Sequence, residues 1–348
     1  MKRLTLLILW ILAFATATAH QPATMRNGYD YFPLRGAVKH MRHYSSAFFE
    51  SEGARIYDTI RGGYTMSLYN FDRKGNVMQE SYFRAPRDKK SKSVRKECDV
   101  YYVYDERGNC TERRTIYQID SARDSHIVYY AYDKRGHLAE SYDLRANGRK
   151  IRYNRYKHNR KGQKVKHQYR SSAPASRKDM EPNPQMRYKY NADGQCVREV
   201  RYNLSGQIRE VVKMSYDAQG NLVKRSSIPK VRPNRDGVII ISTGESYSHI
   251  VKLYRYDQRG NCINIRTFID GEEYKDEMVV EREYDEWDNC TKYRNYLLEG
   301  DTTRRGDEAY YQYEYDEQGN WIKRIELKES DGKLTPRWIT VREISYYE

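Results

Sequence analysis

The chain is short of the side chains from which most proteins build a core. Leu, Ile, Val and Phe together account for 62 of its 348 residues, a share so low that, at a net charge of +15, disorder would be the default expectation. Proline is scarce as well, with 9 residues, and no apolar run long enough to span a bilayer follows the N-terminus. These shortages exclude a conventional aliphatic core and a polytopic helical membrane protein.

Tyrosine supplies what the aliphatic residues do not. The chain contains 35 tyrosines, whereas disordered chains are poor in aromatic residues. Tyrosine favours strands and buries a large ring while its hydroxyl stays hydrogen-bonded. The composition therefore predicts a folded, tyrosine-rich β protein.

The N-terminus has the order of a secretory signal peptide. Lys2 and Arg3 precede an apolar run over residues 4–15, and the small residues Ala17 and Ala19 follow. We expect residues 1–19 to be a signal peptide cleaved after Ala19. The mature chain is then an exported protein with no transmembrane segment, in the periplasm or at the cell surface of a bacterium.

A six-residue turn signature recurs nine times along the rest of the chain. One copy is Tyr104-Asp105-Glu106-Arg107-Gly108-Asn109. Asp or Asn opens a type I turn by bonding the backbone ahead of it, and Gly accepts the left-handed conformation of the closing bulge. Asp is among the few other residues that tolerate this conformation. The residues expected at the left-handed position are Gly75, Gly108, Gly136, Gly162, Gly194, Gly220, Gly260, Asp288 and Gly319.

Residues on both sides of the signature alternate with the period of a strand. Tyr311, Tyr313 and Tyr315 share one face, for example. Successive signatures are 26 to 40 residues apart, which leaves room for two strands and a second turn each. The second turns are expected at 85–97, 118–126, 144–149, 170–186, 203–206, 226–248, 269–276, 298–308 and 330–334. The sequence thus predicts an all-β, antiparallel up-and-down meander of roughly 18–20 strands, twisted or coiled as a ribbon.

One copy of the repeat departs from the others at two positions. In eight of the nine copies an apolar residue follows the signature, as a buried cross-strand pair requires. In the remaining copy Lys164 stands there, and His158 replaces the aromatic residue at the start. Both partners change together, so we expect this hairpin to be the least buried.

The residues of the signature resemble the YD repeats of the RHS/YD-repeat family. The matching element is Tyr-x-Tyr-Asp-x-x-Gly-Asn followed by an apolar residue, as in residues 313–321. It extends over residues 64–348, after an N-terminal segment with the first strands at 20–63. The resemblance implies an extracytoplasmic β-repeat protein of a family associated with carbohydrate binding, surface contact and shells around toxins. Because the chain is short and ends on a strand, we expect a member without a toxin domain.

The five cysteines allow two interpretations. In an exported protein they suggest two disulfides and one free thiol. Four of them, however, occupy the same repeat position: Cys110, Cys196, Cys262 and Cys290. Equivalent positions lie two strands apart, about 10 Å, which is beyond the reach of a disulfide. The repeat register favours five free thiols that pack as small apolar side chains.

No constellation of catalytic or metal-ligating residues stands out. The histidines are scattered, and His40 and His43 would face opposite sides of a strand. The sequence contains no CxxC, HExxH, P-loop or GxSxG motif. We therefore expect no enzyme, no cofactor and no metal. The alternative is a carbohydrate-active enzyme whose site is spread over distant strands.

Charge is distributed unevenly along the mature chain. Residues 20–235 contain 45 Lys and Arg against 23 Asp and Glu, whereas residues 236–348 contain 16 against 25. Part of the basic excess falls in the expected long loops, and part of the acidic excess falls in residues 270–277. The predicted binding residues are Arg87, Lys89, Lys90, Lys92, Arg95, Lys96, Arg177, Lys178, Lys230, Arg232 and Arg235.

Two kinds of partner fit this distribution. A basic loop edge suits an anionic polysaccharide or another cell-envelope component, with tyrosine rings as platforms, and an exported protein is not expected to bind nucleic acid. The alternative role of the loop charges is to keep sheet edges soluble. A basic and an acidic end also allow head-to-tail self-association. An outer-membrane barrel is disfavoured, because charges such as those of Arg187 and Lys189 interrupt any apolar outer band.

Overall fold

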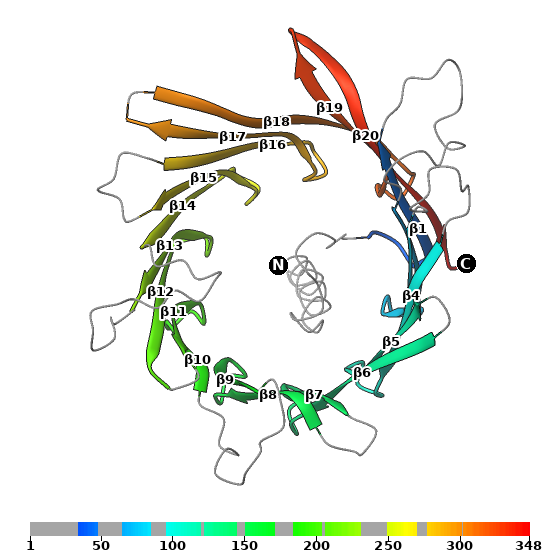
Figure 1. The fold of residues 1–348 in the computed structure, drawn as a ribbon, viewed down its shortest axis with the longest axis vertical. Coiled ribbons are helices and arrows are strands. Elements are labelled where there is room, and N and C mark those ends of the chain that lie inside the picture. The colour runs from blue at the N-terminus through cyan, green and yellow to red at the C-terminus, as the bar shows by residue number, and fades with distance from the viewer. Residues whose placement is uncertain are drawn as a thin grey trace, which may run out of the picture.

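The computed structural model describes residues 34–47, 65–84, 95–119, 122–144, 150–170, 184–203, 206–230, 249–269, 277–300 and 302–348. These residues form twenty strands and no helix (Figure 1). The first ten are β1 (Val38–Ala47), β2 (Thr65–Phe71), β3 (Val77–Arg84), β4 (Arg95–Tyr104), β5 (Cys110–Ile119), β6 (Ala122–Tyr132), β7 (Leu138–Leu144), β8 (Lys150–His158), β9 (Lys164–Arg170) and β10 (Pro184–Tyr190). The second ten are β11 (Cys196–Tyr202), β12 (Ile208–Tyr216), β13 (Leu222–Pro229), β14 (Ile250–Tyr256), β15 (Cys262–Ile269), β16 (Glu277–Tyr284), β17 (Cys290–Glu299), β18 (Thr302–Tyr315), β19 (Trp321–Ser330) and β20 (Lys333–Tyr346).

The meander closes on itself. Each strand pairs antiparallel with the next, and β1 pairs with both β2 and β20, so that Tyr44 lies opposite Met66 on one side and Val341 on the other. Figure 1 shows the resulting ring. The predicted all-β up-and-down meander is confirmed, and its ribbon is a closed barrel. Twenty strands enclose a lumen too wide for side chains to fill.

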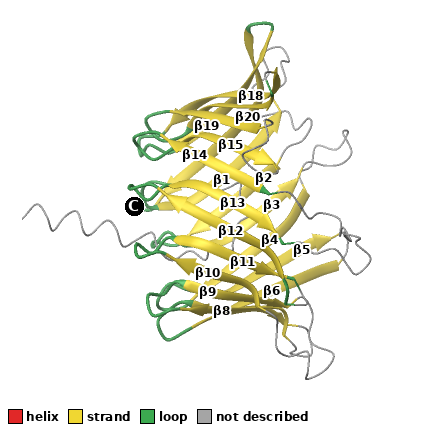
Figure 2. Cartoon of the chain, turned by 90° about the vertical axis from the view of Figure 1, so that its left-hand side faces the viewer, coloured by secondary structure: helices red, strands yellow, loops and turns green. Residues whose placement is uncertain are grey.

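The two edges of the barrel differ. Tight turns gather at one edge, here called the signature edge, and the other connections gather at the opposite edge (Figure 2). Two connections predicted at 118–126 and 298–308 are much shorter than expected, because the strands continue into them. Ile119 pairs with Ala122, and Glu299 pairs with Thr302. The polar segments that the sequence predicted as loops continue the β-ladder at these two places.

Side chains of the signature hold each turn in place. In one copy the Asp105 N–H donates to the Asn109 carbonyl at 2.9 Å, and the Gly108 N–H donates to the Asp105 carbonyl at 2.9 Å. The Asp105 carboxylate accepts bonds from the backbone N–H of Arg107 and from the backbone N–H and side-chain amide of Asn109. All nine residues expected at the left-handed position have φ between 65° and 90°. Asp288 has a φ of 65°.

A tenth turn of the same kind lies at the opposite edge. The Asn203 N–H donates to the Gln207 carbonyl and the Gly206 N–H to the Asn203 carbonyl, each at 3.0 Å. The sequence analysis placed a turn at 203–206 without identifying it as a copy of the signature. In every copy that has Asn in place of the turn-opening Asp, the last residue of the turn is Gln. The Asn side-chain amide then donates to the Gln side-chain oxygen. A neutral amide needs this acceptor. The Asp of the other copies accepts instead, from the side chain of Asn or His in most copies and from a tyrosine hydroxyl at Asp285 and Asp316.

The signature tyrosines face the lumen. Asp217 directs both its N–H and its C=O toward β13. In a strand of L-residues, the strand direction and the side taken by these two groups fix the face of the side chain. β12 runs toward the signature edge. In Figure 1 the opposite edge faces the viewer, and from that side β13 follows β12 clockwise around the ring (Figures 1 and 2). Asp217 therefore points outward and Tyr216 inward, and the repeat gives every signature tyrosine the same inward orientation.

Tyrosine hydroxyls bridge the places where neighbouring hairpins separate. The β3–β4 ladder ends at Gln79 and Tyr101, which leaves the Val77 carbonyl without a backbone partner on that side. The Tyr104 hydroxyl donates to this carbonyl at 2.8 Å. Seven junctions contain the same bond at 2.7–3.0 Å. Its donors are Tyr104, Tyr132, Tyr190, Tyr216, Tyr256, Tyr284 and Tyr313.

Cysteines occupy the acceptor position of several of these bonds. The carbonyls of Cys110, Cys196, Cys262 and Cys290 accept tyrosine hydroxyls, and each thiol donates to the carbonyl two residues on. All five cysteines are free thiols. Burial raises the pKa of Cys110 to about 11, so this thiol is protonated and unreactive at neutral pH.

We expect loss of one bridging hydroxyl to destabilise the barrel measurably. Tyr104→Phe leaves the Val77 carbonyl without its donor and should lower the free energy of unfolding by about 1–2 kcal/mol. Tyr101→Phe on the same strand is the matched control, because its exposed side chain makes no hydrogen bond within the described structure. Denaturant titration of both variants measures the difference. Equal stability of the two variants would contradict a role for the hydroxyl.

The same tyrosines predict alkaline instability. Burial raises the pKa of Tyr130 to about 12 and raises that of Tyr104 and Tyr313 further. A pKa that is higher in the folded state leaves stability unchanged below the unfolded value of about 10 and removes it as the pH rises above that value. The free energy of unfolding should therefore stay level to about pH 9 and fall beyond about pH 10. Ionisation of all the tyrosines before the barrel unfolds, rather than of exposed ones such as Tyr101 alone, would contradict buried hydroxyls.

The cysteines make a prediction of their own. A thiol count on unfolded, unreduced protein should give five, because the register keeps equivalent cysteines beyond bridging distance. A count of one would mean that two disulfides form.

Candidate functional site

Most of the predicted binding residues lie outside the described residues. These are Arg87, Lys89, Lys90, Lys92, Arg177, Lys178, Arg232 and Arg235. Three others are described. Arg95 donates to the Gln118 carbonyl at 3.3 Å, Lys96 pairs with Asp99 at 2.8 Å, and Lys230 is exposed at the end of β13. No cationic cluster is formed by these three residues alone.

Closure of the barrel converts the charge asymmetry of the sequence into a spatial one. The basic stretch supplies β1 to β13, and the acidic stretch supplies β14 to β20. Each set of strands forms one continuous arc of the ring (Figure 1). The described strands have no open edge, because β1 occupies the edge of β20. Head-to-tail association by pairing of free strand edges is therefore not available to this part of the chain. Such association would have to rely on charge complementarity between the two arcs.

Two rungs of cations cross the outer wall of β8 to β12. Lys157 lies opposite Lys166, which lies opposite Arg187. In the second rung Lys189 lies opposite Arg198, which lies opposite Lys213. Neighbouring strands place such side chains about 5 Å apart, where like charges repel. We call these six residues the cationic face.

The strands β8 to β12 offer no carboxylate to five of the six members of the cationic face. The carboxylates within β8 to β12 are Glu199 and Glu210, and both lie on the lumen side, where each pairs with Arg201 at 2.6 Å and 2.8 Å. Within the described part of the chain, no ion pair is formed by five members of the face: Lys157, Arg187, Lys189, Arg198 and Lys213. The arrangement costs stability that the strands themselves do not recover.

The cationic side chains remain accessible. Lys157, Arg187, Lys189 and Lys213 are exposed. Val200 lies opposite Arg187 and Val211 opposite Val200, and both valines are buried, 8% and 5% exposed. Long aliphatic stems that cover a small apolar floor while their charges stay in water explain this burial.

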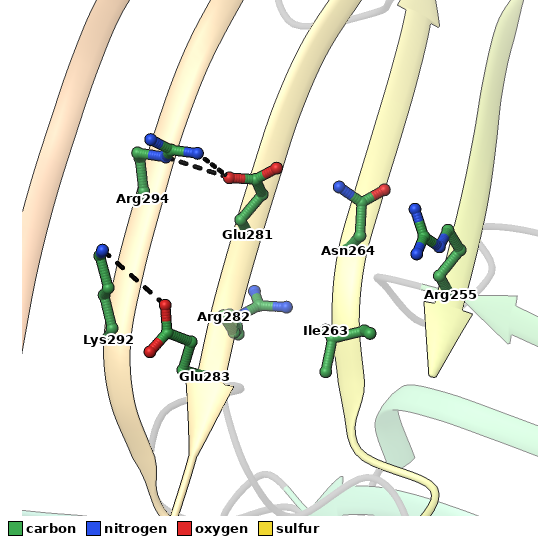
Figure 3. Close-up of a pocket in the computed structure, with 8 residues that line it drawn as sticks. All are labelled: Arg255, Ile263, Asn264, Glu281, Arg282, Glu283, Lys292 and Arg294. Atoms are coloured by element: carbon green, nitrogen blue, oxygen red, sulfur yellow. Dashed lines mark hydrogen bonds and ion pairs between the residues drawn. The ribbon is translucent and has the colours of Figure 1, made fainter. Parts of the chain in front are cut away.

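The acidic arc shows how the same fold normally arranges outer charges. On β16 and β17, Arg294 pairs with Glu281 and Lys292 lies 3.8 Å from Glu283 (Figure 3). On β15 and β16, Arg266 pairs with Glu277 at 2.7 Å. A shallow hollow of about 240 Å³ is lined by Glu281, Glu283, Lys292 and Arg294, together with residues of β14 and β15. Here each cation faces a carboxylate across the strands, which is the pattern that the cationic face lacks.

Arg255 stands at the border between the two patterns. It lies on β14, where its side chain is exposed, and its cross-strand neighbour is the neutral Asn264 (Figure 3). Beyond it the next residue in the same rung is Glu281. In this rung the acidic arc therefore begins with Glu281, two strands from Arg255.

Groups with catalytic or metal-binding potential are used structurally. His40 and His43 lie on opposite faces of β1, as predicted, and burial lowers the pKa of His43 to about 3. Within the described ranges no group of three or more metal-ligating side chains comes together. No described segment forms an apolar helix of bilayer-spanning length.

Sequence reasoning missed the cationic face because it looked for charge in loops. The signal was present: Arg187 and Lys189 alternate with Tyr188 and Tyr190. Period two places both cations on the face opposite the tyrosines. Their neighbours across the strands depend on register, which the loop between β9 and β10 does not fix.

Comparisons with known proteins give little further guidance. No protein-family model and no curated protein matches the chain. Among solved structures, the Tc holotoxin pore of Photorhabdus luminescens is 14% identical over 80% of this chain, with a TM-score of 0.35. A porin-like protein from Bacteroides uniformis is 6% identical over 90% of this chain and 99% of its own length, with a TM-score of 0.36.

The chain is also similar to the TcdB2–TccC3 complex without its hypervariable C-terminal region, at 14% identity over 78% of this chain and a TM-score of 0.35. It spans 14% of the length of each of the two toxin chains. At these TM-scores the likenesses carry no argument, and the resemblance to the RHS/YD-repeat family rests on the sequence motifs.

Proposed function

We propose that the chain is an exported, non-catalytic binding or scaffold protein that contacts an anionic polysaccharide of the cell envelope through the cationic face. The observation that carries the proposal is the alignment of six cations in like-charged cross-strand rungs. A polyanion laid on the outer wall offsets this repulsion, because it places negative charge between the rungs and releases bound counterions.

An extended polymer fits the face better than a small anion. The rungs cross five adjacent strands, and the strand spacing of about 4.8 Å sets a regular interval between charges. An exported protein meets acidic glycans rather than nucleic acid, which selects the polysaccharide.

Binding to immobilised polygalacturonate tests the proposal, with neutral dextran as the control matrix. The double variant Lys189→Gln, Lys213→Gln should bind about thirtyfold more weakly, since a cation near an anionic surface contributes about 1 kcal/mol. Retention of the unaltered protein should fall steeply with salt. The same variant should be slightly more stable than the unaltered protein, because a like-charge rung is removed. Weaker binding together with higher stability separates loss of contact from loss of fold.

Lys292→Gln combined with Arg294→Gln is the matched control. It removes the same charge from outer-wall cations that face carboxylates, so polygalacturonate binding should change little. Equal losses in the two double variants would show that net charge alone is sensed, and no loss in either would overturn the proposal. Release of reducing sugar from the polymer would instead favour the alternative, a carbohydrate-active enzyme.

A further inference from the structure

The junction between β7 and β8 lacks the tyrosine bridge. Toward the signature edge, the last paired residues of the β7–β8 ladder are Glu140 and Arg155. At the seven bridged junctions, the bridging tyrosine lies three residues after the last paired residue of its strand. His158 occupies that position, and it donates no hydrogen bond to the Leu138 carbonyl within the described structure. Two other junctions between described hairpins lack the bond. At β1–β2 the signature residue is Phe71, which has no hydroxyl, and at β19–β20 Tyr346 and the Arg35 backbone bond to Asn320 instead.

Two imidazoles take the place of the bridge. His158 stacks on His137, the last residue of the preceding turn, with ring centroids 5.1 Å apart and planes inclined by 24°. His137 also bonds the Asp133 carboxylate through Nδ1 at 3.2 Å. A Cβ atom at Gly162 would come within 2.4 Å of His137 Nε2, so the next turn packs closely against the pair.

The surroundings of His158 favour its neutral form. Burial, His137 and Lys164 lower the pKa of His158, and Asp133 opposes them. Lys164 lies directly across from His158 on β9. Arg135 reaches across the turns to the Arg160 carbonyl at 3.1 Å. The charged groups that act on His158 are thus one carboxylate, already bonded to His137, and the cation of Lys164.

The opposite end of the same junction is arranged differently. His126 lies 2.8 Å from the Asp143 carboxylate, which also pairs with Arg152 at 3.1 Å. His126 thus contacts both an anion and a cation, because the Arg152 guanidinium lies 3.2 Å from its Nε2. The ladder there is irregular, with a register shift between Ser141 and Asp143 and a φ of 45° at Arg152. Such a backbone conformation is strained for an arginine.

We infer that the β7–β8 junction is the point at which the barrel opens in acid. Protonation of the stacked pair brings two cationic rings together beside Lys164, at the junction that has no hydroxyl bridge and a distorted ladder. A pKa that is lower in the folded state leaves stability fully present above the unfolded value of about 6.5 and removes it as the pH falls below that value. The inference is independent of any bound polymer.

Hydrogen exchange of the full mature chain tests this inference. Between pH 8 and pH 5, after correction for the intrinsic exchange rate, amides of β7 and β8 should lose about tenfold more protection than those of β11 and β12. His158→Tyr, which restores the residue used at seven other junctions, should abolish the difference and raise the melting temperature at pH 5. Equal protection at both junctions in the unaltered protein would overturn the inference.

Two further variants exclude a general effect of histidine. Tyr190→His installs the imidazole at the β9–β10 junction without a stacking partner, so it should weaken that junction at pH 8 and pH 5 alike. His126→Gln should leave the acid sensitivity of β7 and β8 in place, since His126 lies at the other end of the junction and takes no part in the stacked pair. Loss of acid sensitivity in His126→Gln, or its retention in His158→Tyr, would contradict the role assigned to the stacked pair.

Discussion

The barrel depends on one recurring bond, from a tyrosine hydroxyl to a carbonyl on the neighbouring hairpin. Neighbouring hairpins separate near their tight turns. A carbonyl at the start of the strand that follows each turn is therefore left without a backbone partner. The hydroxyl of Tyr104 reaches the carbonyl of Val77, and six other tyrosines repeat the contact. The bond satisfies a buried acceptor while the ring covers apolar residues beside it. One side chain thus does the work that a hydroxyl and an aliphatic residue share in other sheets.

This construction explains how a chain so poor in aliphatic residues folds. A closed single-layer sheet around a wide lumen has no central core to fill, so it needs side chains that bury area along the wall. One cluster surrounds Val100 and contains Met41, Tyr69, Tyr102 and Cys110, each of them 6% exposed or less. Closure also removes the edges at which a β-rich exported protein would aggregate.

The outer wall divides into two arcs that treat charge differently. Between β14 and β17, cations face carboxylates, as Arg266 faces Glu277. Between β8 and β12 they face other cations, as Lys189 faces Arg198. Turn, ladder and lumen side follow the same repeat in both arcs, so the repeat itself does not account for the contrast. It distinguishes the cationic face from ordinary surface charge, and the exceptional His137–His158 pair stands at the beginning of that arc.

The sequence by itself determined the strand count, the meander and the turns. Its nine signatures repeat local interactions, and Asp105 or Gly108 needs only its own turn to adopt its conformation. The alternation of Tyr188 with Lys189 likewise fixes opposite faces, because the period of a strand is a local property. The free thiols followed from the same register.

Only the tertiary structure decided closure and which side chains meet. Pairing of β1 with β20 joins residues about 300 apart in the sequence, such as Tyr44 and Val341, and no local signal specifies their register. Lys157, Lys166 and Arg187 come into line through two ladders, one of which crosses a long loop. The extension of β5 and β18 into expected loops has the same cause, since a polar segment becomes strand when its neighbour offers a partner. Long-range hydrogen bonding, which a repeat unit does not encode, placed the site.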